Sequence, residues 1–167
     1  MTNNDILRSI RYMLDLSDQK VVEIVQLALT DSRLAPSRLE LEITESVLLE
    51  NSESNLRTLQ ALKDLGVCIA LDDFGTGYSS LGYLRSFPFD RIKIDKSFVH
   101  DMGESREAMS IIRAITGMSS SLLINTTAEG VETEAQFKQL QAEGCSHFQG
   151  YLFGHPRPAE MRQKKDR

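Results

Sequence analysis

The sequence predicts an α/β fold built on a parallel sheet of about five strands. Short apolar runs alternate with longer amphipathic stretches from Arg38 onward, and acidic residues follow most of the apolar runs. The chain has 167 residues, of which 41% are hydrophobic and 26% are charged, as in an ordinary globular protein. We therefore expect one folded domain.

The first expected element is an amphipathic helix near the N-terminus. Ile6, Ile10, Met13 and Leu14 stand at offsets of four, seven and eight residues, which places them on one helix face. We therefore expect a helix over residues 5–16.

A second helix is expected over residues 21–30. Val21, Val22, Val25 and Leu29 lie on one side of this segment at helical spacing. The helix should end before Pro36, because the residue that precedes a proline disfavours the helical conformation.

The rest of the chain predicts five strands and four helices in alternation. Each strand is a short apolar run, and each helix is a longer amphipathic stretch. Such alternation implies parallel strands with helices as connections. The strands are expected at 39–44, 67–73, 91–95, 122–129 and 147–153, and the helices at 55–65, 79–86, 106–120 and 134–141.

Charge and composition disfavour several classes of function. The chain has 19 Lys and Arg against 24 Asp and Glu, a net charge of −5, which disfavours DNA or RNA as a partner. No segment approaches the ~20 apolar residues of a membrane helix, and the N-terminus lacks a signal-peptide pattern, so we expect a cytoplasmic protein without membrane contact. Cys68 and Cys145 stand far apart in apolar segments, which argues against a disulfide or zinc framework.

Polar side chains gather at the C-terminal ends of the expected strands. In a (β/α)8 barrel these ends meet on the face that carries the active site. A single acid there would simply cap the next helix, but seven carboxylates would repel one another without cations, so we expect a metal site. The polar residues are Glu42, Glu45, Asp72, Asp73, Lys93, Asp95, Glu129, Glu132 and Gln149.

The paired aspartates suggest a particular chemistry. Asp72 and Asp73 would diverge on a regular strand, but at a strand end both carboxylates can turn toward shared ions. Two cations about 3.5–4 Å apart are the usual means of attack on a phosphodiester. Gly75, Thr76 and Gly77 follow at once, but this loop fits neither the Walker nor the dinucleotide fingerprint.

Five segments resemble the EAL domain family in order and approximate spacing: LEITES, LDDFGTGYSSL, RIKIDKSFV, TAEGVET and QGYLFG. That family consists of bacterial signalling enzymes that open cyclic di-GMP to linear pGpG, using two Mg²⁺ or Mn²⁺ ions on a modified (β/α)8 barrel. The resemblance therefore implies cyclic di-GMP as the partner and Mg²⁺ or Mn²⁺ as the cofactor.

The resemblance also implies roles for individual residues. Glu42, Asp72, Asp73 and Glu129 match metal ligands of the family. Lys93 resembles the residue that holds the attacking water, and Glu129 resembles the general base. A lysine that is simply paired with Asp95 is the structural alternative for Lys93. Supporting or substrate-contacting positions are Glu45, Asp95, Glu132, Gln149, Gly75, Thr76 and Gly77.

Two departures from the family pattern shape the remaining expectations. The E-A-L tripeptide is absent from the sequence, and the position of the family's N-x-S element falls near Ile10, with Tyr12 in place of the serine. We expect residues 1–16 to form a divergent helix and residues 17–167 to form the C-terminal portion of an EAL domain. The fold would be a partial (β/α)8 barrel that lacks its first strands.

A partial barrel has consequences for activity and assembly. We expect weak or no catalysis, with one ion or none bound, because ligands of the family are missing. Exposed sheet edges predict a homo-oligomer or a domain-swapped dimer. Two alternatives stay open, a module that binds cyclic di-GMP or a protein without catalysis and a non-functional remnant. An aldolase-like barrel would need Lys93 as a Schiff-base nucleophile.

Overall fold

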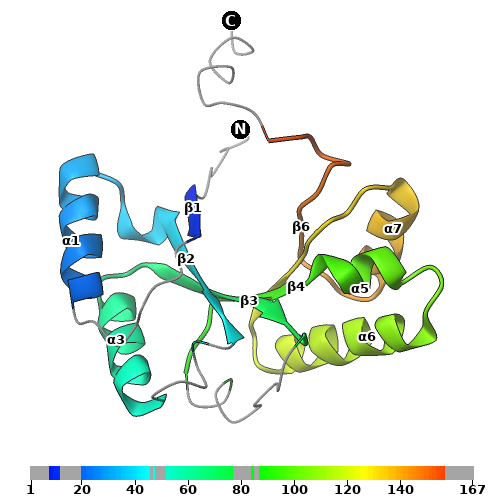
Figure 1. Ribbon diagram of the computed structural model, residues 1–167, viewed down its shortest axis with the longest axis horizontal. Helices are drawn as coiled ribbons and strands as arrows, with labels where there is room; N and C mark the ends of the chain where they lie inside the picture. The colour runs from blue at the N-terminus through cyan, green and yellow to red at the C-terminus, as the bar shows by residue number, and fades with distance from the viewer. Residues whose placement is uncertain are drawn as a thin grey trace, which may run out of the picture.

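A computed structural model of the chain describes residues 8–11, 20–45, 47, 52–76, 84 and 87–156 (Figure 1). These residues form a six-stranded parallel sheet whose strand order follows the chain, and within the described part of the chain β1 and β6 are its two edges. The strands are β1 (Arg8–Arg11), β2 (Leu39–Thr44), β3 (Cys68–Phe74), β4 (Arg91–Ile94), β5 (Asn125–Ala128) and β6 (His147–Phe148).

Helices connect the strands and flank the sheet. In Figure 1, α1 and α3 flank the side of β1 and β2, whereas α6 and α7 flank the side of β5 and β6. No helix among the described residues is long and apolar enough to cross a membrane. The helices are α1 (Lys20–Ser32), α3 (Ser52–Asp64), α5 (Lys96–Asp101), α6 (Arg106–Ser121) and α7 (Glu134–Ala142), with a short 3-10 helix η1 at Pro36–Arg38.

The two faces of the sheet differ in chemistry because side chains alternate along each strand. Leu41 and Ile43 of β2 belong to the apolar core, which also takes in Ile92 of β4 and Ile112 of α6. Glu42 projects from β2 with the opposite alternation and is also buried. The sheet therefore has an apolar face packed on helices and a second, polar inner face.

The N-terminal segment corrects one expectation. The helix expected over residues 5–16 is wrong at Arg8–Arg11, which form β1. This strand pairs with β2 in parallel, from Arg8 beside Leu39 to Arg11 beside Glu42. The backbone groups along β2 need partners, and this pairing outweighs the helical spacing of Ile10 and its neighbours. The sheet accordingly has six strands.

Most other expected elements are confirmed. The strands at 39–44, 67–73 and 91–95 and the helices at 21–30, 55–65, 106–120 and 134–141 agree with the structure to within a few residues. The last two strands are shorter than expected, and α5 had no counterpart in the prediction. Apart from Leu84, the helix expected at 79–86 lies outside the described residues.

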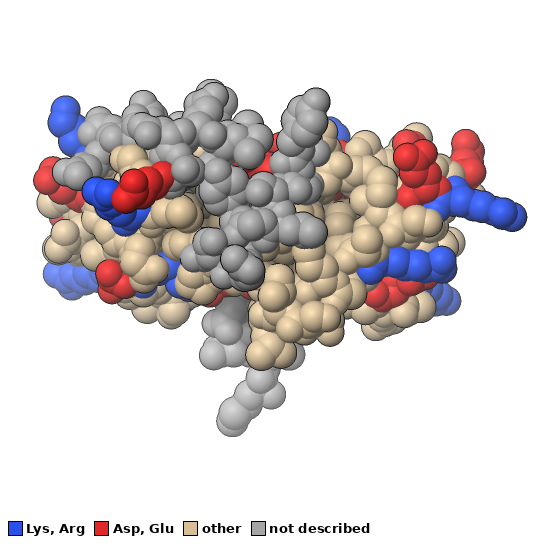
Figure 2. Space-filling model, turned by 90° about the horizontal axis from the view of Figure 1, so that it is seen from below, with Lys and Arg blue, Asp and Glu red and all other residues tan. Residues whose placement is uncertain are grey.

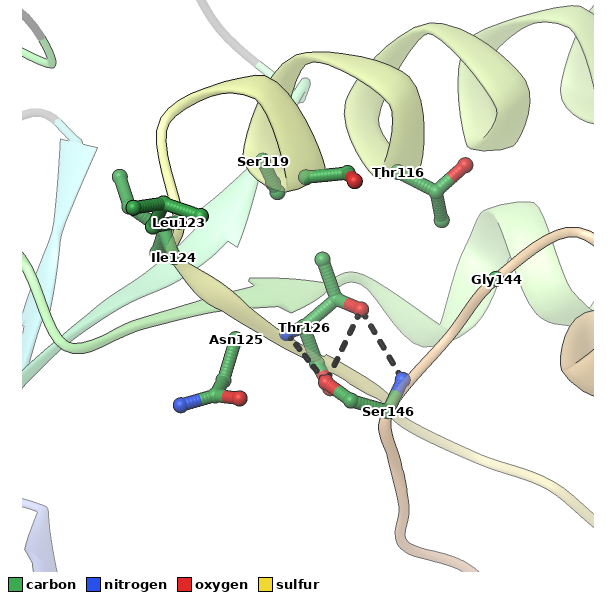
Figure 3. A pocket seen from close by; sticks show the side chains of 9 residues that line it. Thr116, Ser119, Leu123, Ile124, Asn125, Thr126, Gly144 and Ser146 are labelled. Carbon is green, nitrogen blue, oxygen red and sulfur yellow. Dashed lines mark hydrogen bonds between the residues drawn. The ribbon is translucent and has the colours of Figure 1, made fainter.

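A cluster of hydroxyl groups joins the N-terminal ends of β5 and β6 (Figure 3). The Thr126 N–H donates to Ser146 Oγ at 2.8 Å, and Ser146 Oγ donates to the Thr126 carbonyl at 2.9 Å. A pocket lined by Thr116, Ser119 and Asn125 adjoins these bonds. Because this pocket lies at the start of β5, it is at the opposite end of the sheet from the acidic strand ends.

Charged side chains of both signs are interspersed on the part of the surface seen in Figure 2. Some surface charges are paired, as Arg113 on α6 is with Glu143 after α7, at 2.8 Å. Exposed pairs of this kind contribute little to stability.

Candidate metal centre

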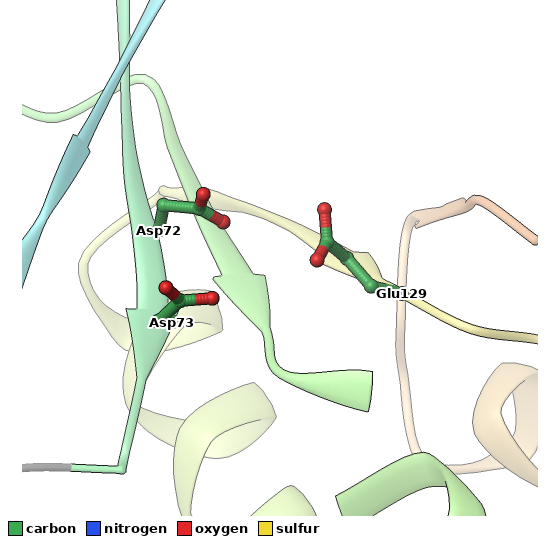
Figure 4. A group of neighbouring side chains, drawn as sticks. All are labelled: Asp72, Asp73 and Glu129. Atoms are coloured by element: carbon green, nitrogen blue, oxygen red, sulfur yellow. The ribbon is translucent and has the colours of Figure 1, made fainter. Parts of the chain in front are cut away.

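Three carboxylates meet at the C-terminal ends of β3 and β5 (Figure 4). Asp72 and Asp73 stand near the end of β3, and Glu129 directly follows β5. One carboxylate oxygen from each residue lies within 4.8 Å of the others. Figure 4 shows the three side chains pointing into the same space. We call these residues the acidic cluster.

A local irregularity of β3 brings the two adjacent aspartates together. Asp73 has a φ of 53°, in the left-handed region that non-glycine residues rarely adopt. The pairing of β3 with β4 also shifts register between Leu71 and Phe74. Such bulges redirect side chains near active sites. The irregularity explains how neighbouring residues on one strand both face the cluster.

Lys93 of β4 lies between the acidic strand ends and contacts carboxylates from three strands. Its Nζ is 2.9 Å from Glu42 Oε2, 3.1 Å from Asp72 Oδ1 and 2.6 Å from Glu129 Oε1. Only 4% of the Lys93 side chain is exposed, against 1% for Asp72 and 13% for Glu129. Lys93 is therefore a buried cation enclosed by carboxylates.

The carboxylates determine the protonation state of Lys93. Burial alone would lower its pKa, but hydrogen bonds to Glu129 and Glu42 and the charges of Glu129 and Asp72 outweigh burial. The net result is a raised pKa, so the amine is protonated at neutral pH. A protonated amine is not a nucleophile, which argues against the Schiff-base alternative.

Asp95 does not provide the pair that was considered for Lys93. Its side chain is the N-cap of α5 and accepts a hydrogen bond from the Ser97 N–H at 3.0 Å. Lys93 instead forms ion pairs with Glu42, Asp72 and Glu129. The expected alternative, in which Lys93 is simply paired with Asp95, is therefore wrong. Asp95 caps α5 instead.

The remaining predicted site residues border the cluster to different degrees. Glu45 is buried just after β2. Thr76 Oγ1 donates to the Asp73 carbonyl at 2.8 Å, and Gly75 adopts a φ of 94° beside it, so both residues shape the turn after Asp73. Gly77 lies outside the described residues.

Two further predicted residues follow β5 and β6. The Gln149 N–H donates to the Ala128 carbonyl at 2.9 Å, and the Gln149 carbonyl accepts from Val131 at 3.0 Å, so its backbone is fixed beside Glu129. Glu132 is exposed, and its N–H donates to Gln136 Oε1 of α7 at 2.9 Å. The backbone bonds fix Gln149 beside the cluster, while Glu132 packs against the start of α7.

The described donor set fits a divalent cation. Mg²⁺ and Mn²⁺ prefer carboxylate oxygens, and three such oxygens already converge in the acidic cluster. The four carboxylates of Glu42, Asp72, Asp73 and Glu129 with the one ammonium of Lys93 leave a formal charge of −3. Buried negative charge of this size needs cations for balance.

Sequence reasoning missed a polar layer beneath the cluster. Arg91 Nε donates to Glu40 Oε2 at 2.8 Å, and Arg91 Nη1 donates to Thr127 Oγ1 at 3.0 Å. Strand alternation already places Glu40 below Glu42 and Arg91 below Lys93, which was the available signal. The contacts themselves depend on the strand register, which the sequence does not supply.

Comparison with known proteins connects this site to a family. A family model described as EAL domain matches residues 4–156, which begins before the boundary expected at Ser17. Among curated relatives, the cyclic di-GMP phosphodiesterase NbdA of Pseudomonas aeruginosa is 44% identical over 144 residues. The aligned region is 86% of this chain and 18% of NbdA, so the chain spans about a fifth of that relative's length.

Solved structures show the same fold. The PaMucR phosphodiesterase, in complex with c-di-GMP, superposes with a TM-score of 0.88 at 39% identity, covering 92% of this chain and 63% of PaMucR. The manganese and cy-diGMP complex of Klebsiella pneumoniae BlrP1 gives a TM-score of 0.81 at 33% identity, covering 89% of this chain and 38% of BlrP1. These superpositions confirm the expected fold class, an α/β sheet of the barrel type.

Proposed function

The chain belongs to the EAL domain family, and on that premise we propose that it is part of a cyclic di-GMP phosphodiesterase domain in bacterial second-messenger signalling. The observation that carries the proposal is the acidic cluster with Lys93 enclosed beside it. The relatives NbdA and PaMucR, named as phosphodiesterases of this nucleotide or solved with it, support the choice of substrate.

The proposed cofactor is Mg²⁺ or Mn²⁺, held by Glu42, Asp72, Asp73 and Glu129. The manganese complex of BlrP1 supports this choice of ion class. Divalent cations at such a site supply Lewis-acid polarisation of a phosphoryl oxygen and lower the pKa of a bound water. Hydrolysis would add one water across one phosphodiester bond of cyclic di-GMP and yield linear pGpG.

The residues of the chain have distinct tasks in this proposal. Lys93 holds Glu42 and Glu129 in place through its hydrogen bonds, and its positive charge favours a hydroxide nearby. Among the carboxylates that contact Lys93, that of Glu129 is the most exposed. We therefore assign Glu129 the role of the general base that accepts a proton from the attacking water. Asp72 is the most deeply buried of them and serves as a ligand.

The test is incubation of the purified chain with cyclic di-GMP and Mn²⁺, with linear pGpG followed by chromatography. We expect slow product formation that requires Mn²⁺, because the E-A-L tripeptide is absent and a lost metal partner typically costs ~10–100-fold. Asp72→Asn should abolish the product, since it removes a buried carboxylate of the acidic cluster. Asp101→Asn is the matched control, because Asp101 is exposed and pairs with His100.

A second candidate function is binding of cyclic di-GMP without turnover. The contacts of the Lys93 ammonium with Glu42, Asp72 and Glu129 favour it, because the ammonium competes with cations for these carboxylates. Nucleotide that binds the chain while no pGpG forms would support this candidate and reject the first. A chain that neither binds nor cleaves cyclic di-GMP would contradict both.

A further inference from the structure

We infer that Arg91, held by Glu40 and Thr127, is a positioning residue for the acidic cluster. The inference rests on the proposed function, because it assigns Arg91 a role in divalent-cation binding. Arg91 lies two residues before Lys93 on β4, which places it on the same face about 7 Å lower along the strand.

The contacts of Arg91 join three strands. Its guanidinium meets Glu40 of β2 at 2.8 Å and Thr127 of β5 at 3.0 Å. Only 11% of the Arg91 side chain and 8% of the Glu40 side chain are exposed. The planar guanidinium fixes the relative position of its partners because its donors point in set directions.

We call Glu40, Arg91 and Thr127 the lower layer. The same three strands carry the upper layer, which consists of Glu42, Lys93 and Glu129. Glu42 of β2, Lys93 of β4 and Glu129, directly after β5, each stand two residues after a member of the lower layer. Lys93 contacts both carboxylates at 2.9 and 2.6 Å, distances that require the strands to keep their spacing. The lower layer therefore sets the geometry in which the upper carboxylates converge.

A small residue on β3 makes the lower layer possible. β3 lies between β2 and β4, and Ala70 pairs with Arg91 on one side and with Glu42 on the other. Ala70 is completely buried. Its methyl group leaves room for the Arg91 side chain to cross β3 and reach Glu40, which a longer side chain would block.

The charge arrangement gives Glu40 a second task. Arg91 stands across Ala70 from Glu42 in the strand register, and Glu40 balances the charge of Arg91 within the lower layer. Without Glu40, the guanidinium would turn toward Glu42 and compete with a divalent cation for that carboxylate. The charge of Arg91 also acts on His147 of β6. The pKa of His147 is lowered mainly by burial and to a smaller extent by the positive charge of Arg91.

The test measures Mn²⁺ affinity by isothermal titration calorimetry together with the thermal unfolding midpoint. Arg91→Met should weaken Mn²⁺ binding ~10-fold or more, the usual effect of losing an outer partner of a metal site. Glu40→Gln should also weaken it, and the double variant should bind no more weakly than the weaker single variant. Arg113→Met is the matched control, because Arg113 is an exposed arginine on α6 whose ion pair is with Glu143 rather than with a residue of the sheet.

A purely structural ion pair would behave differently. In that case Arg91→Met would lower the unfolding midpoint while the folded protein kept wild-type Mn²⁺ affinity, and this result would overturn the inference. If Arg91→Met does not fold, Arg91→Lys and Thr127→Val provide the same comparison, because each removes part of the bridge with little change in volume. Wild-type affinity in both of these variants would equally overturn it.

A readout that needs no metal separates this inference from the proposed function. The NMR signals of the Lys93 ammonium report its contacts with the three carboxylates, and they should change in Arg91→Met but not in Arg113→Met. Unchanged ammonium signals would overturn the positioning role. Failure of the wild-type chain to bind Mn²⁺ would overturn the proposed function, whereas the ammonium signals would still decide the role of Arg91.

Discussion

Lys93 is the residue that determines the electrostatics of the site. Its ammonium contacts carboxylates of Glu42, Asp72 and Glu129, and no more than 13% of any of these side chains is exposed. An ammonium in this position balances part of the negative charge that divalent cations would otherwise balance alone. Removing it should therefore affect the metal-free protein most.

We predict that Lys93→Met lowers the free energy of unfolding by ~3–5 kcal/mol in the presence of EDTA, because it leaves buried carboxylates unbalanced. Saturating Mn²⁺ should reduce this loss, since the cations supply positive charge at the same place. Urea unfolding in EDTA and in Mn²⁺ measures both values. The control is the exposed Lys138→Met, and an equal small loss in both variants would contradict the prediction.

The strand-end pattern predicted that carboxylates converge, but not which of them do, since Asp95 caps α5 and Glu132 packs at the start of α7. Asp72, Asp73 and Glu129 do form a cluster, and Lys93 and Glu42 lie beside it. The φ of Asp73 was beyond prediction, because it arises from the register shift between β3 and β4. The bridge from Arg91 was likewise hidden, since it depends on which side chains the strand register brings into reach.

At the scale of elements, tertiary pairing decided where the sequence pattern alone did not. Apolar residues at 6, 10, 13 and 14 fit a helix, yet residues 8–11 pair with β2 as a strand. The segment after Ile94 gave no strong periodic signal, yet it forms the six-residue helix α5. A short helix of this kind depends on its cap and on packing more than on its own propensity.

We predict that Asp95→Ala destabilises the protein by about 1 kcal/mol and leaves Mn²⁺ affinity unchanged, because Asp95 caps α5 through the Ser97 N–H. Asp95→Ser should recover most of the loss, since serine also caps helices well. Chemical denaturation and Mn²⁺ titration of the two variants check the prediction. Weaker Mn²⁺ binding at unchanged stability would instead place Asp95 in the metal site.

At the scale of the whole molecule, the sheet has two edge strands, β1 and β6. Strand edges present unpaired backbone groups that other chains can pair with. Tyr151 and Phe153, just after β6, are each 57% exposed and add apolar surface near that edge. The strand–helix alternation predicted the parallel sheet correctly, whereas the edges were predicted poorly, since β1 was expected as a helix and β6 is shorter than the expected strand.

We propose that the chain associates through these edges, and we predict a dimer or larger oligomer at micromolar concentration. Size-exclusion chromatography with light scattering measures the mass directly, against the 18.8 kDa of one chain. Changes of Tyr151 and Phe153 to serine should shift the mass toward one chain if the β6 edge is used. A wild-type protein that runs as a strict monomer would contradict the prediction.

We propose that Asp72, Asp73 and Glu129 together hold a divalent cation, which anomalous diffraction from crystals grown with Mn²⁺ can locate. We expect an anomalous peak among the carboxylate oxygens of these three residues in the wild-type protein. The peak should be absent from Asp72→Asn crystals prepared in the same way. Wild-type crystals at saturating Mn²⁺ with no peak at the cluster, or with a peak only elsewhere, would contradict the account.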